Sequence, residues 1–296
     1  MPVYRFVTLD VFTDRPFGGN QLAVFPDAEG LTGAQMQALA TELNLAETTF
    51  VLPPQDPSHT ARVRIFTAAE EMPFAGHPNV GTGFVLAGEG RDRAGGMVFE
   101  ELAGLVEIRI DRDGAGAVTG AEIAAPQPLA TGATFTAAQL AACLGIGESS
   151  IVTQGHLPVM ATVGVGFLVV EVTADGLAKV APNLAACQAL EALIPATDIR
   201  LAIHLYVRSP AGLRVRMFST AGGRLTEDAA TGSANATLGA LLLSLTSDDR
   251  AAYNISQGVE MGRPSLLKVT ARRTPEGIRA TVGGGCVPMF KGEVTL

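Results

Sequence analysis

Tryptophan is absent from this chain of 296 residues, and aromatic residues together make up only 5% of it. Positive charge is also scarce: 21 Lys and Arg residues face 29 Asp and Glu residues, which gives a formal charge of −8 at pH 7. A nucleic-acid-binding surface needs a basic field and commonly uses aromatic side chains that stack on bases. The composition therefore predicts no nucleic-acid partner.

Long apolar segments are missing as well. The first residues, MPVYRFVTLDVF, alternate like a strand and include Arg5 and Asp10, which a signal peptide would not contain at these places. The longest uncharged apolar stretch, LPVMATVGVGFLVV, is interrupted by Pro158, Gly164 and Gly166 and is too short to cross a bilayer. These features predict a cytoplasmic protein with no membrane partner.

Cysteine and histidine are rare, with three and four residues. Cys143, Cys187 and Cys286 are far apart, odd in number and surrounded by small or apolar residues, which is typical of buried hydrophobic side chains rather than of disulfides. The histidines lie in separate segments, without the spacing that puts two metal ligands on one face of an element. We therefore expect no disulfide framework, no metal site and no cofactor.

Apolar residues are abundant. Hydrophobic residues make up 47% of the chain and charged residues 17%, which favours a compact globular protein over a disordered one. The length exceeds that of a usual single domain and suggests two domains of roughly 150 residues or one large one.

Local patterns predict both strands and helices. Alternating patterns and short apolar runs predict strands at residues 3–12, 21–26, 48–52, 62–66, 97–100, 105–111, 200–208 and 213–218. Apolar residues that recur every three to four positions predict helices at residues 32–44, 136–144 and 183–193. The stretch VGTGFVLAG is apolar on most sides and predicts a buried helix, and ANATLGALLLSL predicts another helix.

The order of these elements occurs twice. The spacing Gly-x-x-Asn-x-x-x-Gly begins at Gly76 and again at Gly232, 156 residues later. Ahead of it, Arg-x-Phe begins at Arg64 and again at Arg216, 152 residues later. Coincidence is the alternative, because Gly and Ala are common here. An internal duplication predicts two similar lobes, residues 1–118 and 119–296, with the last strand free to return to the first lobe.

The stretch EMPFAGHPNVGTG places His77 between Gly76 and Pro78, where the predicted buried helix begins. Two interpretations are open: an ordinary loop ahead of a core helix, or a binding site in which an imidazole lies at a helix N-terminus. Backbone N–H groups at a helix N-terminus bind anions, and a substrate carboxylate is such an anion.

The second half repeats this arrangement in TEDAATGSAN. Asp228, Gly232 and Ser233 could form a simple helix cap, or the Gly232 and Ser233 amides could hold a carboxylate. Glu47, in LAETTF, lies between a predicted helix and an apolar strand. Burial there would raise its pKa and make it a useful base, although a glutamate at a strand start is more often solvated.

Five segments, taken together, closely resemble the phenazine biosynthesis family typified by the PhzF isomerase. They are LDVFTDRPFGGNQLAVF, LAETTFVL, RIFTAAEEMPFAGHPNVGT, EDAATGSANATL and QGVEMGRPSLL, and the resemblance runs from residue 3 to about residue 293. It implies an α+β fold like that of diaminopimelate epimerase. In that fold two similar lobes, each a curved and mostly antiparallel sheet or barrel around a central helix, hold the active site between them. It also implies a homodimer.

The resemblance also implies a function and a set of site residues. The function is a cofactor-independent isomerase that moves a proton on a small cyclic carboxylic acid, like the trans-2,3-dihydro-3-hydroxyanthranilate isomerase of phenazine biosynthesis, with the physiological substrate left open. The implied catalytic residues are Glu47, His77 and Asp228, and the implied substrate-binding residues are Gly76, Gly232 and Ser233. Glu71 is expected to be structural.

The chain also departs from the family. Ala68, Ala229 and Thr220 stand where the family usually has proline, and each change would loosen a turn by about 0.4–1 kcal/mol. Related epimerases use one thiol from each lobe, but Ala75 and Ala229 stand at those places, which argues against a two-thiol racemase. Two alternatives stay open: an inactive small-molecule-binding or interaction protein on the same fold, and, as the weaker one, a cysteine-free epimerase or racemase.

Overall fold

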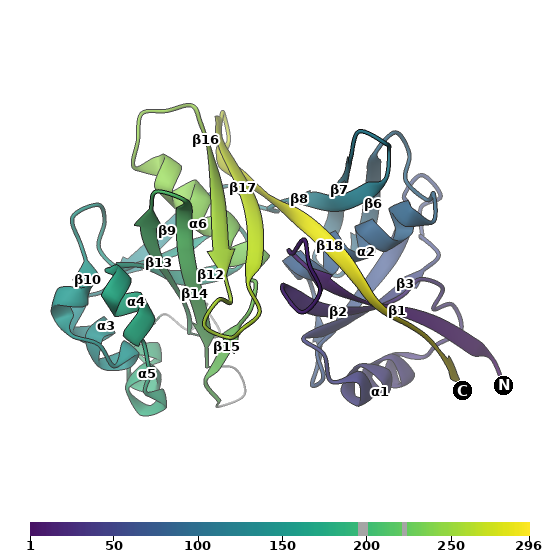
Figure 1. The fold of residues 1–296 in the computed structure, drawn as a ribbon, viewed down its shortest axis with the longest axis horizontal. Helices are drawn as coiled ribbons and strands as arrows, with labels where there is room; N and C mark the ends of the chain where they lie inside the picture. Colours follow the sequence, from purple (N-terminus) through teal and green to yellow (C-terminus); the bar gives the residue numbers. More distant parts are fainter. Residues whose placement is uncertain (195–200, 221–223) are drawn as a thin grey trace. The chain divides into compact units, whose positions relative to one another are not determined.

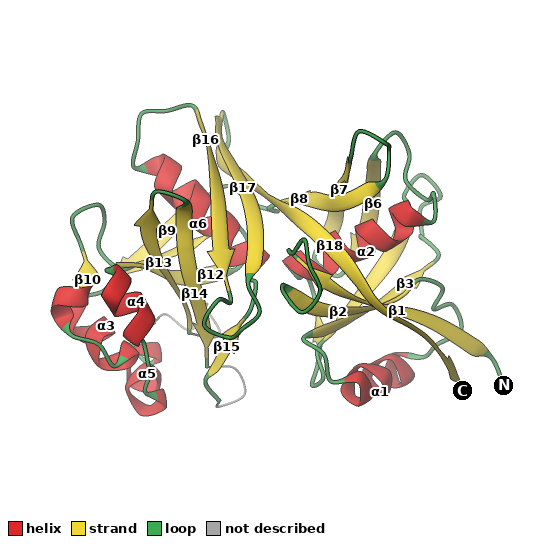
Figure 2. Ribbon diagram, in the orientation of Figure 1, coloured by secondary structure: helices red, strands yellow, loops and turns green. Residues whose placement is uncertain are grey.

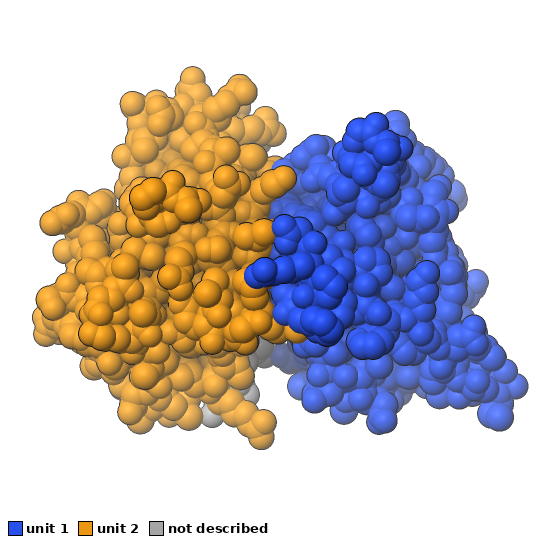
Figure 3. All heavy atoms as spheres, viewed as in Figure 1, with its two compact units in different colours: residues 1–124, 282–296 blue, residues 125–281 orange. Residues whose placement is uncertain are grey.

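The computed structural model describes residues 1–194, 201–220 and 224–296, and these form a mixed α+β protein (Figure 2). The chain divides into two compact units (Figure 3). Unit 1 consists of residues 1–124 and 282–296, and unit 2 of residues 125–281. The boundary predicted at residue 118 would cut strand β8 (Val118–Ala124), and the units divide just after this strand.

The strands of unit 1 pair in a closed, mostly antiparallel ring. The order is β1 (Val3–Val11), β2 (Asn20–Phe25), β3 (Glu47–Leu52), β4 (Ala61–Phe66), β6 (Gly96–Glu101), β7 (Gly104–Arg112), β8 and β18 (Gly277–Thr295), which pairs with β1 again. The pairs β2–β3 and β4–β6 are parallel. A short strand, β5 (Glu71–Met72), pairs with β4. Unit 1 is therefore a barrel that the last strand of the chain completes.

Helix α2 (Gly76–Gly88) packs against β1, β2, β7 and β8 of this barrel, and 11 of its 13 residues are buried (Figure 1). A helix that is apolar all round is stable only when surrounded, as VGTGFVLAG predicted. Its glycines bring it close to the strands: a Cβ added at Gly83 would lie 2.7 Å from Cγ2 of Ile108.

Unit 2 follows the same plan. Its pairing order is β9 (Ala130–Thr134), β11 (Val159–Thr162), β12 (Gly166–Val172), β13 (Ala202–Ser209), β14 (Gly212–Ser219), β16 (Arg250–Gln257) and β17 (Ser265–Thr274), with β15 (Thr226–Asp228) beside β14 and β10 (Ile151–Val152) beside β12. Helix α6 (Gly232–Ser244) packs against β11, β12, β16 and β17, and 11 of its 13 residues are buried. Residue 200, where a strand was predicted to begin, lies outside the described residues.

Smaller helices form the outer layer. In unit 1, α1 (Gly33–Leu43) connects the parallel strands β2 and β3 and covers a cluster of buried residues that includes Phe25, Phe50 and Phe66. In unit 2, α4 (Ala174–Lys179) and α5 (Leu184–Glu191) make the matching connection from β12 to β13, and α3 (Ala137–Leu144) packs against α5.

The cysteine prediction was wrong for two residues. Cys143 on α3 and Cys187 on α5 form a disulfide, with their Cα atoms 4.8 Å apart. They are separated by 44 residues, so the sequence gave no spacing signal, and the packing of α3 on α5 brings them together. Cys286 is free and buried, and its burial raises the pKa of the thiol.

Candidate active site

Glu47 and His77 meet within unit 1. Glu47 is the first residue of β3 and His77 the second residue of α2. Nε2 of His77 lies 2.9 Å from Oε2 of Glu47, and the two side chains are only 6% and 18% exposed, respectively. Pro78 follows in the first turn of the helix, where a missing N–H costs little. The structure thus places two predicted catalytic side chains in direct contact and mostly out of water.

Asn20, the first residue of β2, sets the tautomer of His77. Its Nδ2 lies 3.4 Å from Nδ1 of the ring, while its Oδ1 accepts a hydrogen bond from the N–H of Gln21 at 3.1 Å. An amide nitrogen can only donate, so Nδ1 accepts and a neutral ring carries its proton on Nε2. The nitrogen that carries this proton lies 2.9 Å from Oε2 of Glu47. Asn20 lies inside a family-like segment, but nothing in its spacing singled it out.

In unit 2, Asp228 lies at the end of β15, three residues before the N-cap of α6, Thr231. The Thr231 hydroxyl donates to Oδ2 of Asp228 at 2.6 Å. Gln257 donates from Nε2 to the Asp228 carbonyl at 2.9 Å and to the Thr231 hydroxyl at 2.9 Å. These contacts fix both the backbone and the carboxylate of Asp228. Sequence reasoning missed both partners: Thr231, which lies only three residues from Asp228, and Gln257, which lies 29 residues away.

A buried network extends behind this turn. Asn235 donates from Nδ2 to Oε1 of Gln257 at 2.8 Å and to the Thr231 carbonyl at 3.0 Å. Oδ1 of Asn235 accepts from Nε2 of His204 at 3.2 Å. Burial lowers the pKa of His204 to about 3, so this ring is neutral and donates through Nε2. His204 is therefore a structural histidine, and its network holds the first turn of α6.

The two buried helices begin without side-chain caps. In the described part of the chain, α1, α3, α4 and α5 each begin at a Thr or Asn whose side chain accepts from the first turn. Helices α2 and α6 begin at Ala75 and Thr231, which make no such bond. At Gly76 and Gly232, therefore, no side-chain oxygen offsets the positive end of the helix dipole. This favours the binding of an anion at these two helix N-termini.

The remaining predicted residues follow from these positions. Gly76 and Gly232 are buried and Ser233 is half-buried, each in the first turn of its helix. Glu71 forms a bidentate ion pair with Arg64, with both distances 2.7 Å, as a structural residue would. Within the described ranges, no group of three or more His, Cys, Asp or Glu residues could hold a metal ion.

Thr220, Ala229 and Ala68, which stand where the family usually has proline, differ in the hydrogen bonds that they make. The N–H of Thr220 donates to the Leu201 carbonyl at 3.1 Å and its hydroxyl to Glu191 at 3.0 Å. A proline could make neither bond, so Thr220 adds contacts rather than merely loosening a turn. The carbonyl of Ala229 accepts from the Ser265 hydroxyl at 2.8 Å, and that of Ala68 from Thr41 at 2.7 Å.

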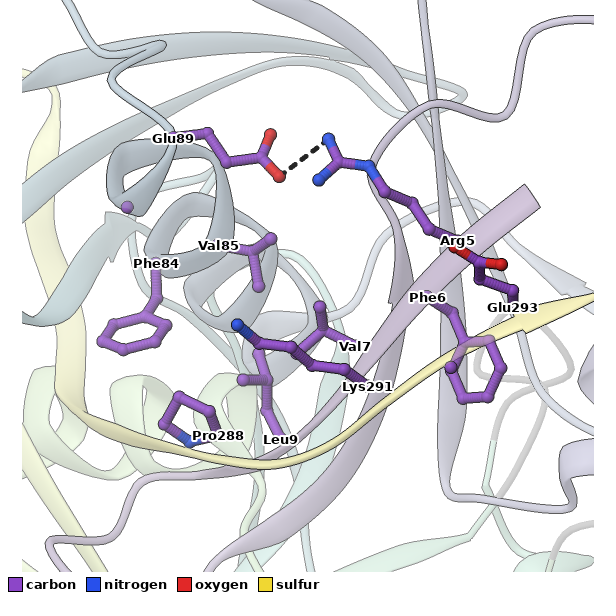
Figure 4. A pocket seen from close by; sticks show the side chains of 12 residues that line it. Arg5, Phe6, Val7, Leu9, Phe84, Val85, Glu89, Pro288, Lys291 and Glu293 are labelled. Carbon is purple, nitrogen blue, oxygen red and sulfur yellow. Dashed lines mark ion pairs between the residues drawn. The ribbon is translucent and has the colours of Figure 1, made fainter. Parts of the chain in front are cut away.

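A separate hollow lies at the other end of α2. Its volume is about 580 Å³. The Arg5–Glu89 ion pair lies at its edge (Figure 4). Its lining comes from β1, the last turns of α2 and β18, and includes Phe84 and Lys291. None of the predicted site residues lines it. None of the described helices is both long and apolar enough to span a membrane.

Comparison with known proteins gives consistent results. Residues 9–292 match the family model described as phenazine biosynthesis-like protein. A trans-2,3-dihydro-3-hydroxyanthranilate isomerase from Pseudomonas aeruginosa is 36% identical over 308 aligned positions, which cover 99% of this chain and 100% of that protein. Among solved structures, a PhzF family protein from Bacillus anthracis has a TM-score of 0.86 at 24% identity, with full coverage of both chains. A hydroxyproline epimerase from Agrobacterium vitis, 14% identical, shares the fold with a TM-score of 0.62 over 99% of this chain and 93% of its own.

Proposed function

Because the chain belongs to the phenazine biosynthesis-like family, whose curated relatives include named isomerases, we propose that it is a cofactor-independent isomerase that moves a proton on a small cyclic carboxylic acid. The observation that carries this proposal is the Glu47–His77 contact at the uncapped start of α2. A mostly buried carboxylate facing an N–H can accept a proton from carbon, and a positioned base contributes about 10²–10⁴ in rate.

The proposed reaction needs one base and a conjugated substrate. Glu47 takes a proton from a ring carbon, and the electrons of the broken C–H bond move into the conjugated system. A new C–H bond then forms at another carbon, with the proton returned from the same carboxyl group. Nε2 of His77 lies 2.9 Å from Oε2 of Glu47, and this contact orients the carboxylate beside the start of α2. No electron leaves the substrate, so the step is a pure isomerisation.

The residues of unit 2 are proposed as substrate-binding residues. The amides at Gly232 and Ser233 suit a carboxylate, and the Asp228 carboxylate, held by Thr231, suits an amino or hydroxyl group. The overall charge of −8 gives no long-range attraction for an anion, so local backbone dipoles must provide it.

Deuterium incorporation tests the proposal. The first substrate to try is trans-2,3-dihydro-3-hydroxyanthranilate, named in the curated relatives. Wild-type protein in D₂O should produce an isomer with deuterium at the carbon that becomes protonated, wherever the transferred proton exchanges with solvent, and Glu47→Gln should not. Deuterium at the original carbon with inverted configuration would indicate an epimerase instead. Binding of the compound without turnover or exchange would support the inactive binding protein. We further propose a cytoplasmic homodimer, which light scattering of the purified protein and cell fractionation would test.

A further inference from the structure

The hollow beside the last turns of α2 lies within unit 1 and has a mostly apolar lining. Its volume of about 580 Å³ falls within the range of roughly 300–1,000 Å³ that is typical of sites for small molecules, which often lie in the mouths of barrels. Gly88 and Gly292 also line it, and a Cβ at Gly88 would have nothing within 4 Å. The apolar residues of the lining are Phe6, Val7, Leu9, Phe84, Val85 and Pro288.

A β-bulge in β18 decides which of its side chains face this hollow. Leu9 of β1 is level with Pro288 of β18. Thr8, one residue earlier, is level with Phe290, so Met289 is an extra residue in β18. From Phe290 onward, each side chain of β18 therefore faces the side opposite to the one that it would face in a regular strand.

The bulge exchanges a phenylalanine for a lysine on the inner face of the barrel. This face is identified by Leu9, whose Cδ1 would lie 3.2 Å from a Cβ added at Gly81 of α2. Without the bulge, Phe290 would be level with Val7 and would face α2. Instead Lys291 is level with Val7, and Phe290 is 67% exposed. Burying the phenyl ring would favour folding, so folding alone gives no reason for this exchange.

Lys291 brings an uncompensated positive charge to the hollow. Its side chain extends from β18 toward α2 (Figure 4), and its Nζ makes no hydrogen bond or ion pair with any residue that the structure describes. The other cation of the lining, Arg5, pairs with Asp27 at 2.7 Å and with Glu89 at 2.9 Å. Glu293 is level with Arg5 and points away from Lys291 (Figure 4).

We propose that this hollow binds a small carboxylate with an apolar body. The carboxylate pairs with Nζ of Lys291, and the body lies against Val7, Leu9 and Val85. A ligand that fills the hollow removes water from the ammonium group, and this loss is offset only if the ligand brings a negative charge. The proposal does not depend on the proposed isomerase activity, because none of the predicted site residues lines the hollow.

Benzoate and benzamide are suitable probes, because they have nearly the same shape and only benzoate is charged. In protein with carbon-13-labelled Val and Leu methyl groups, benzoate should cause saturable shifts at Val7, Leu9 and Val85, with a dissociation constant of about 1 mM or lower. Benzamide should bind roughly tenfold more weakly, because it makes no charged hydrogen bond. Equal binding of both compounds would overturn the proposal, as would benzoate shifts confined to other methyl groups.

Variants of the lysine test its role. Lys291→Met keeps the length of the side chain, and it should weaken benzoate binding roughly tenfold without changing benzamide binding. Lys291→Arg should retain most of the affinity. Lys268→Met, which alters an exposed lysine on β17 in unit 2, is the matched control and should change neither. If Lys291→Met lowers the Tm but leaves benzoate binding unchanged, the lysine only offsets the negative end of the α2 dipole, and the proposal fails.

A filled hollow gives the final test. Val7→Phe places a phenyl ring on the face that the bulge denies to Phe290, and it should abolish the benzoate shifts at Leu9 and Val85 without lowering the Tm. Benzoate shifts that persist at these two residues would show that the hollow is not the site. Shifts of the same methyl signals on dilution, without any ligand, would mean that a second copy of the chain covers the hollow, which would also overturn the proposal.

Discussion

The two units share a scaffold but not the residues that we propose as catalytic. The ion pair between Arg64 and Glu71 recurs as that between Arg216 and Glu227, and Asn79 recurs as Asn235. The reactive positions differ: by strand register and helix position, Glu47 corresponds to Ala202, His77 to Ser233, and Asp228 to Met72. The duplicated residues are those that hold strands and helix ends, and the residues proposed as catalytic are not duplicated.

This division bears on mechanism. A racemase that works with one acid and one base on opposite faces needs a proton carrier of similar kind in each copy. Here the carboxylate of Glu47 has an alanine as its counterpart, and Ser233 replaces the imidazole. One base that takes and returns a proton on the same side is the chemistry that such an asymmetric pair supports.

The largest expected effect is on turnover. Glu47→Gln keeps the shape of the side chain and removes the base, so kcat should fall by about 10²–10⁴ while the dissociation constant of the substrate changes little. The matched variant at the corresponding position, Ala202→Gln, should keep wild-type kcat. A loss of the same size in both variants would mean that the two units are chemically equivalent, contrary to the comparison.

The repeated ion pair should matter more in unit 2. Arg216 is 9% exposed and Arg64 28% exposed. Arg216 also donates to the carbonyls of Leu177 and Val180. Arg216→Met leaves the half-buried Glu227 without its ion-pair partner and should reduce the free energy of unfolding by about 3–5 kcal/mol. Arg64→Met should cost about 1 kcal/mol, since water reaches that pair more easily. Urea denaturation of both variants measures the difference, and equal losses would contradict the burial argument.

The disulfide has no counterpart in unit 1 among the described residues. Replacing Cys143 and Cys187 together by Ala should lower the free energy of unfolding by about 2–4 kcal/mol, because the unfolded chain regains the freedom of a 44-residue loop. Thermal melts with and without dithiothreitol give the control: the reductant should lower the Tm of the wild type and leave that of the double variant unchanged. If dithiothreitol left the Tm of the wild type unchanged, the disulfide would not stabilise unit 2.

The smallest effects concern the glycines of the two buried helices. Gly83 and Gly239 occupy matching places, and a Cβ would collide with Ile108 at the first and with Val269 at the second. Ala at either position should cost about 1–3 kcal/mol through overpacking, which exceeds the gain of about 1 kcal/mol in helix propensity. Gly88→Ala is the control, because nothing lies within 4 Å of a Cβ there. If Gly88→Ala destabilises as much as Gly83→Ala, close packing is not the cause.

Much of this plan could be predicted from sequence. The buried helices are apolar on all sides, and their shared Gly-x-x-Asn-x-x-x-Gly spacing pointed to the duplication before any coordinates. The family resemblance pointed to Glu47 and His77 as candidate catalytic residues, and the structure adds that their side chains are in contact.

The partners of these residues could not be predicted in the same way. Asn20 contacts His77, 57 residues away, and Gln257 contacts Asp228, 29 residues away; such contacts depend on how distant segments pack, which a local pattern does not reveal. The disulfide was missed for a related reason, because its two cysteines come together only through the packing of α3 on α5. The spacing of residues within one segment predicted local structure, whereas contacts between distant segments could not be predicted.

The final strand has a consequence for synthesis. Thr295 pairs with Val3, and the two ends of the chain lie beside each other (Figure 1). The barrel of unit 1 therefore cannot close until residues 282–296 have left the ribosome, whereas every residue of unit 2 emerges earlier. For the same reason a short linker could join the two termini, and new ends could be opened in an exposed loop of unit 2, giving a circular permutant that begins and ends elsewhere.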